Sequence, residues 1–209
     1  MQMAATVEVT PDKAGTPSRP RGVEVDIRGT ITTTDGTAPL MPQAVDVWLP
    51  KGWVYNGAKH PACTLAKLNR GGPSACPPES NMGRVEIAVV EDRPSTTPPQ
   101  AIIFNGGRSK MYFWVVVVNP ARVQMAVAGT ITKLGSPRWS YRIHADIPST
   151  LQVVAGIRVV MDIVRGRVGR GDWMATTRCP PDHRWRSHLR MTYAAGQVLD
   201  TDGSVPCRS

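Results

Sequence analysis

Two short segments place a histidine within a few residues of a cysteine, a combination of side chains that can bind zinc. One contains His60 and Cys63, and the other contains Cys179 and His183. Zinc takes sulfur and nitrogen ligands in tetrahedral geometry, but its usual sequence signature pairs two closely spaced cysteines with two closely spaced histidines. Neither segment has that spacing, so we predict no metal site and no other cofactor.

The four cysteines, Cys63, Cys76, Cys179 and Cys207, are better interpreted as disulfide partners, and three connectivities are possible. We favour Cys63 with Cys76 and Cys179 with Cys207, because each pair brackets a stretch containing Pro and Gly and closes a short loop. Each bond stabilises the fold by roughly 3 kcal/mol in the chain-entropy model.

Disulfides persist in oxidising compartments, so the cysteines predict an extracytoplasmic protein, either secreted or held in the cell envelope. The opening residues, Met1–Thr6, lack the basic and apolar regions of a signal peptide. Two alternatives follow: either a signal peptide has been removed, or the thiols stay reduced. No run of apolar residues is long enough for a membrane span.

Arginine dominates the charge of this basic protein. Lys and Arg number 25 against 16 Asp and Glu, a net charge of +9, and guanidinium groups suit phosphate, sulfate and carboxylate. A GC-rich coding genome also produces an arginine-rich, lysine-poor chain, so composition alone decides nothing. The Arg-rich C-terminal third contains the candidate contacts for an anionic polymer: Arg158, Arg165, Arg167, Arg170, Trp173, Arg184, Trp185 and Arg186.

Aromatic faces beside cations can bind anionic polysaccharide or single-stranded nucleic acid. The competing interpretation is a dispersed, solvated basic face with both tryptophans in the core, because alternation along strands sends neighbouring side chains to opposite faces. If the site exists, we expect an anionic cell-envelope polymer or another envelope protein as partner, and we do not expect nucleic acid.

Catalytic signatures are weak. The sequence contains no nucleophile-and-base motif of the common hydrolases, and its four histidines are scattered. His144 and Asp146 share one face of a predicted strand, which favours a cross-strand polar contact over a catalytic pair. We therefore expect a non-catalytic binding module. The alternative is a polysaccharide-active enzyme, which needs two carboxylates facing one groove.

The elements that must position these residues are strands. Apolar and polar residues alternate over 23–28, 45–49, 85–89, 123–127 and 139–147, the period of a half-buried strand. Met111–Val118 is continuously apolar and predicts a central buried strand, and Asn105-Gly106 before it predicts a hairpin turn. With 19 Gly, 19 Pro and no sustained helical period, the sequence predicts an all-β, antiparallel β-sandwich of about nine to eleven strands with little helix.

The chain is predicted to form one domain over residues 1–209, with residues 1–5 disordered. Residues 61–82 contain several prolines and two of the cysteines, and they predict a long disulfide-stapled surface loop. That loop is a first candidate for a functional contact.

Several strings also carry a family resemblance. They are Leu49-Pro50-Lys51-Gly52 with Tyr55-Asn56-Gly57, Ser74-Ala75-Cys76-Pro77, Asn119-Pro120-Ala121-Arg122-Val123-Gln124, and Gly171-Asp172-Trp173 before Cys179-Pro180. Together they resemble uncharacterised secreted β-rich proteins of high-GC Gram-positive soil bacteria, over most of the chain after Thr6. The resemblance implies secretion and the two short-range disulfides, and it supplies no catalytic or binding residues.

Overall fold

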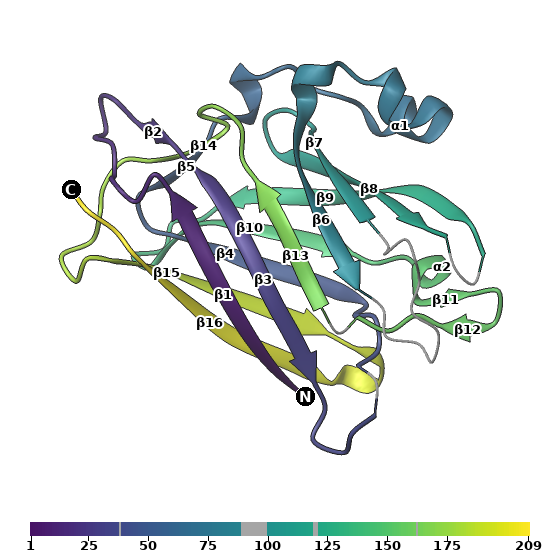
Figure 1. The fold of residues 1–209 in the computed structure, drawn as a ribbon. Coiled ribbons are helices and arrows are strands. Elements are labelled where there is room, and N and C mark those ends of the chain that lie inside the picture. The colour runs from purple at the N-terminus through teal and green to yellow at the C-terminus, as the bar shows by residue number, and fades with distance from the viewer. Residues whose placement is uncertain (38, 89–99, 119–120, 162) are drawn as a thin grey trace.

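One large antiparallel sheet forms most of the molecule (Figure 1). The computed structural model describes residues 1–37, 39–88, 100–118, 121–161 and 163–209, with 54% strand and 12% helix. The eleven strands of the sheet lie in the order β1 (Gln2–Thr10), β3 (Glu24–Thr32), β13 (Ile163–Val168), β6 (Asn81–Ala88), β7 (Gln100–Asn105), β8 (Lys110–Val117), β9 (Val123–Lys133), β10 (Trp139–Asp146), β4 (Ala44–Pro50), β15 (Arg184–Thr192) and β16 (Val198–Pro206). The predicted antiparallel all-β fold is confirmed.

The sheet curls until its two edge strands, β1 and β16, lie against each other. Its two halves therefore face one another like the layers of the expected sandwich, joined into one continuous sheet. Alternate side chains of each strand fill the space between the halves, as Val25 of β3, Leu49 of β4 and Ile131 of β9 do. This shared core explains the period of two in the sequence.

Shorter elements complete the structure. A second sheet has three strands, and a small hairpin and several short helices lie in the connections. These elements are β2 (Arg21–Gly22), β5 (Trp53–Tyr55) and β14 (Met174–Thr176) of the second sheet, the hairpin β11 (Val153–Val154) and β12 (Ile157–Arg158), the helices α1 (Leu65–Gly71) and α2 (Ser149–Gln152), and the 3-10 turns η1 (Gly57–Lys59), η2 (Gly72–Ala75), η3 (Pro78–Ser80) and η4 (Ala194–Gly196). In the described part of the chain, no helix has the length and apolar character needed to cross a membrane.

The predicted hairpin and central strand are both present. β7 and β8 pair around Asn105 and Met111, and β8 is the sixth of the eleven strands. Residues 1–5 were expected to be disordered, but β1 begins at Gln2, which pairs with Thr32 of β3. The first strand therefore includes most of the segment that was expected to be disordered.

The cysteine-stapled segment packs against the sheet instead of projecting as a free loop. The Cys63–Cys76 disulfide is confirmed, with a Cα–Cα distance of 5.3 Å. Leu68 of α1 is fully buried against Phe104 and Trp114, which point outward from β7 and β8. The segment thus covers an apolar outer face of the sheet, a burial that its proline content does not reveal.

Candidate anion-binding site

The two tryptophans of the predicted binding surface belong to the core. Trp173 and Trp185 have exposed fractions of 0% and 1%. The Trp173 indole donates to Asn105 Oδ1 at 3.1 Å, and the Trp185 indole donates to the Arg178 carbonyl at 3.0 Å. Of the two interpretations of these rings, stacking on a ligand is therefore wrong, and the competing one, which places both in the core, is confirmed.

The sheet separates the predicted arginines. Arg165 and Arg167 project from the outer face of β13, the third strand in the sheet order, whereas Arg184 and Arg186 project from β15, the tenth. The other two lie apart from both pairs: Arg158 is on the β11–β12 hairpin, and Arg170 follows β13 and donates to the Pro78 carbonyl at 3.2 Å. The C-terminal third is thus not one continuous surface.

The β13 pair lies in a shallow concavity of about 990 Å³ on the outer face of β1, β3, β13 and β6. Its lining mixes charges, because Asp26 contacts Arg167 at 3.4 Å and Arg28 at 3.5 Å, and Glu86 also faces it. Asp26 and Glu86 are two carboxylates lining one hollow, as the enzyme alternative requires, but the cation beside Asp26 and the open shape differ from a glycosidase cleft.

A more strongly basic region lies at one end of the curled sheet, where two concavities adjoin. The first, of about 760 Å³, lies beside β2 and the segment after β14. The second, of about 480 Å³, lies beside the turn after β4, the β9–β10 connection and the start of β15. Arg178 and Cys179 line both. We call this region the basic end.

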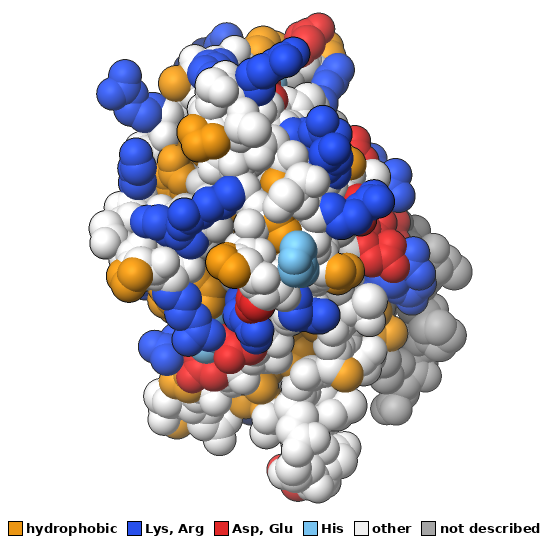
Figure 2. Space-filling model, turned by 90° about the vertical axis from the view of Figure 1, so that its left-hand side faces the viewer, with side chains coloured by type: hydrophobic (Ala, Val, Ile, Leu, Met, Phe, Trp, Pro, Cys, Tyr) orange, Lys and Arg blue, Asp and Glu red, His pale blue; other side chains and the backbone are white. Residues whose placement is uncertain are grey.

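Eight cationic side chains line the basic end, and among its described lining residues only Asp182 carries a carboxylate side chain. Lysine and arginine gather on the side of the molecule shown in Figure 2. The eight side chains are Lys13, Arg19, Arg21, Lys51, Arg138, Arg178, Arg184 and Arg186.

The second predicted disulfide assembles this region and is also confirmed. Cys179 is bonded to Cys207 with a Cα–Cα distance of 5.7 Å. The residue after Cys207 pairs with the N-terminal loop: Arg208 N–H donates to the Asp12 carbonyl at 2.9 Å, and Ala14 N–H donates to the Arg208 carbonyl at 2.7 Å. The disulfide and these hydrogen bonds together connect the segment carrying Arg178 to the loop that follows β1.

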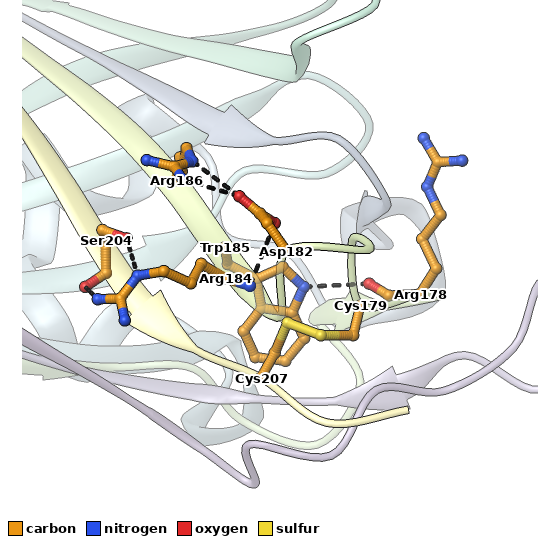
Figure 3. Close-up of a disulfide and its surroundings, with 8 residues drawn as sticks. All are labelled: Arg178, Cys179, Asp182, Arg184, Trp185, Arg186, Ser204 and Cys207. Carbon is orange, nitrogen blue, oxygen red and sulfur yellow. Dashed lines mark hydrogen bonds and ion pairs between the residues drawn. A yellow bond between two sulfur atoms is a disulfide. The ribbon is translucent and has the colours of Figure 1, made fainter.

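The cations of the second concavity are partly held in place. Arg186 contacts Asp182 at 2.8 Å, and Arg184 donates to Ser204 Oγ at 2.6 Å. The hydrogen bond from Arg186 lowers the pKa of the Asp182 carboxyl, which keeps it ionised. Figure 3 shows Arg178 extending on the other side of the disulfide from these two arginines.

The cations of the first concavity have more freedom. In the described parts of the chain, no carboxylate lies within 4.0 Å of Lys13, Arg19, Arg21 or Arg178. The nearby carboxyl of Asp12 is already engaged by Arg208 at 2.6 Å, a hydrogen bond that lowers the Asp12 pKa. Four guanidinium or ammonium groups thus remain available to a ligand.

The histidines that were weighed as catalytic or metal-binding candidates, and not favoured as such, pair with carboxylates. His144 lies between Asp46 at 2.8 Å and Asp146 at 3.3 Å, so the cross-strand contact expected for it is present. His60 pairs with Asp172 at 2.8 Å.

The zinc alternative fails because Cys63 and Cys179 are both in disulfides. No group of three or more potential ligands converges within the described residues.

Sequence reasoning missed six of the eight cations, namely Lys13, Arg19, Arg21, Lys51, Arg138 and Arg178. The loop from Pro11 to Gly22 is visibly rich in Lys and Arg, but its position beside the end of β14 and Arg208 depends on contacts between distant parts of the chain.

Comparison of the chain with protein-family models, curated proteins and solved structures found no match.

Proposed function

We propose that this protein is an extracytoplasmic, non-catalytic module that binds an anionic polymer of the cell envelope through its basic end. The observation that carries the proposal is the convergence of eight cationic side chains, from both terminal regions and the middle of the chain, on two adjoining concavities with one carboxylate side chain. Both disulfides are compatible with the extracytoplasmic location.

Like charges held together repel one another, so a cluster of this kind costs stability until counter-ions or a ligand neutralise it. Guanidinium groups also offer forked donors that fit phosphate, sulfate and carboxylate oxygens. The concavities are open at the surface, which suits a long chain that passes over the protein. These three features favour a polyanion over an enclosed small molecule.

The test compares two variants that remove the same number of charges from different places. Arg19→Ser/Arg21→Ser/Arg178→Ser changes the basic end, and Arg84→Ser/Arg165→Ser/Arg167→Ser changes the concavity on β13 and β6. On a dextran sulfate column, the first variant is expected to elute at clearly lower salt than the second, because each lost contact removes one released counter-ion from the binding equilibrium.

Equal elution of the two variants would show that net charge alone governs retention, and the proposal would fail. Earlier elution of the second variant would place the site on β13 instead. Circular dichroism of all proteins checks that the exposed substitutions leave the sheet intact.

A further inference from the structure

The two concavities of the basic end are not separate sites. Arg178 lines both, and the disulfide beside it holds the wall that they share. Arg178 extends to one side of this disulfide, and Arg184 and Arg186 lie on the other side (Figure 3). A ligand bound in one concavity is therefore in reach of the cations of the next.

The charge and size of the basic end exceed what one small anion can neutralise. The first concavity presents four cations and the second presents five, with Arg178 counted in each. Volumes of about 760 and 480 Å³ each fall in the range of sites for drug-sized ligands. A phosphate or sulfate ion would leave most of the cations without a partner.

The lining offers charge but no stacking platform. No described residue that lines either concavity is aromatic. The nearby Trp139 ring has the Arg138 guanidinium 4.5 Å from its centroid, and Trp185 lies beneath the disulfide in the core. Single-stranded nucleic acids are usually held by stacked bases as well as by their backbone. The basic end therefore suits a chain recognised by its oxyanions alone.

We propose that one linear polymer with repeated oxyanion groups lies across Arg178 and occupies both concavities at once. This inference rests on the proposed function and specifies how its ligand binds. Contacts made in the second concavity are then intramolecular once the first is occupied, so affinity rises with chain length. The shared chemistry is a row of phosphate, sulfate or carboxylate groups.

The experiment titrates wild-type protein with inorganic phosphate, tripolyphosphate and long-chain polyphosphate by calorimetry. Dextran sulfate and polyglutamate test polymers of sulfate and of carboxylate groups, and single-stranded DNA tests a phosphate polymer that also carries bases. At equal concentration of phosphate units, long-chain polyphosphate is expected to bind on the order of a hundredfold more tightly than tripolyphosphate. If single-stranded DNA bound more tightly than every base-free polymer, the inference that the basic end recognises its ligand by charge alone would be overturned.

Single substitutions locate the polymer. Arg19→Ser changes the first concavity, Arg184→Ser the second, and Arg178→Ser both. Each is expected to weaken binding of long-chain polyphosphate on the order of tenfold, as loss of a charged hydrogen bond does. Arg165→Ser, in the mixed-charge concavity on β13, is the matched control and is expected to change affinity little.

Two results would overturn the inference and leave the proposed function standing. One is equal affinity per phosphate unit for tripolyphosphate and long-chain polyphosphate. The other is an effect of substitutions in only one concavity, since a polymer that spans both must respond to each. If wild type and all basic-end variants bind every polymer alike, the proposed function itself fails.

Discussion

Removal of the Cys179–Cys207 bond is expected to weaken both the fold and the basic end. The two cysteines are 28 residues apart in sequence, which corresponds to about 3.5 kcal/mol of loop-closure stabilisation. For a chain of 209 residues, the entropy of unfolding near the midpoint is about 0.4 kcal/mol per kelvin. The variant Cys179→Ser/Cys207→Ser should therefore melt about 8 °C below wild type.

The other disulfide provides a matched control. Cys63 and Cys76 are 13 residues apart, and the same model assigns their bond about 3 kcal/mol. Cys63→Ser/Cys76→Ser should thus lose nearly the same stability, about 7 °C in Tm. This bond lies in the cysteine-stapled segment that packs over β7 and β8, away from the cations of the basic end.

The two variants should differ in polymer binding. Without the Cys179–Cys207 bond, the segment carrying Arg178 is no longer fixed to the C-terminal residues that pair with the N-terminal loop. Binding must then also order the segment that carries Arg178, which costs conformational entropy. Affinity for long-chain polyphosphate should therefore fall on the order of tenfold. Calorimetry well below both melting temperatures measures this. Equal affinity of the two variants would refute the view that the bond organises the site.

Three further substitutions test the packing described above. Burial raises the pKa of the Asp46 carboxyl, but hydrogen bonds from Arg142 and His144 lower it more, so that the pKa lies below its ordinary value of 3.8. The carboxylate therefore stabilises the fold above pH 3.8 and loses this contribution as pH falls through the folded-state pKa. Asp46→Asn should cost roughly 1–3 kcal/mol in urea unfolding at neutral pH and much less at strongly acidic pH, and an equal cost at both would contradict the charge pairing. Leu68→Ala should cost roughly 2–5 kcal/mol in the same assay, because the side chain is fully buried. Asn105→Ala should cost at least about 2 kcal/mol by thermal unfolding, since it leaves the buried Trp173 indole without its acceptor and removes the amide that donates to the Gly57 carbonyl; a change below 0.5 kcal/mol would be inconsistent with that role.

Local patterns in the sequence predicted most of the strands, because one face of each strand meets the core and the other meets water. The same alternation predicts the burial of Trp185, because Arg184 and Arg186 on either side of it are exposed and the side chain between them points inward. Both disulfides were predictable because their cysteines are close in sequence. The strand order was not, since β13 lies between β3 and β6, distant segments whose pairing leaves no local signature.

The distribution of charge over the fold argues against the base composition of the coding genome as the reason for the many arginines. Antiparallel pairing sends every connection to one of two ends of the sheet. The connections at the end of the sheet where the basic end lies, residues 11–23, 51–80, 106–109, 134–138, 169–183 and 207–209, contain twelve Lys and Arg against four Asp and Glu. The described connections of the opposite end contain only Arg122, Arg158 and Asp35. A GC-rich genome would enrich both ends in arginine alike, so the segregation is better explained by a ligand that approaches one end.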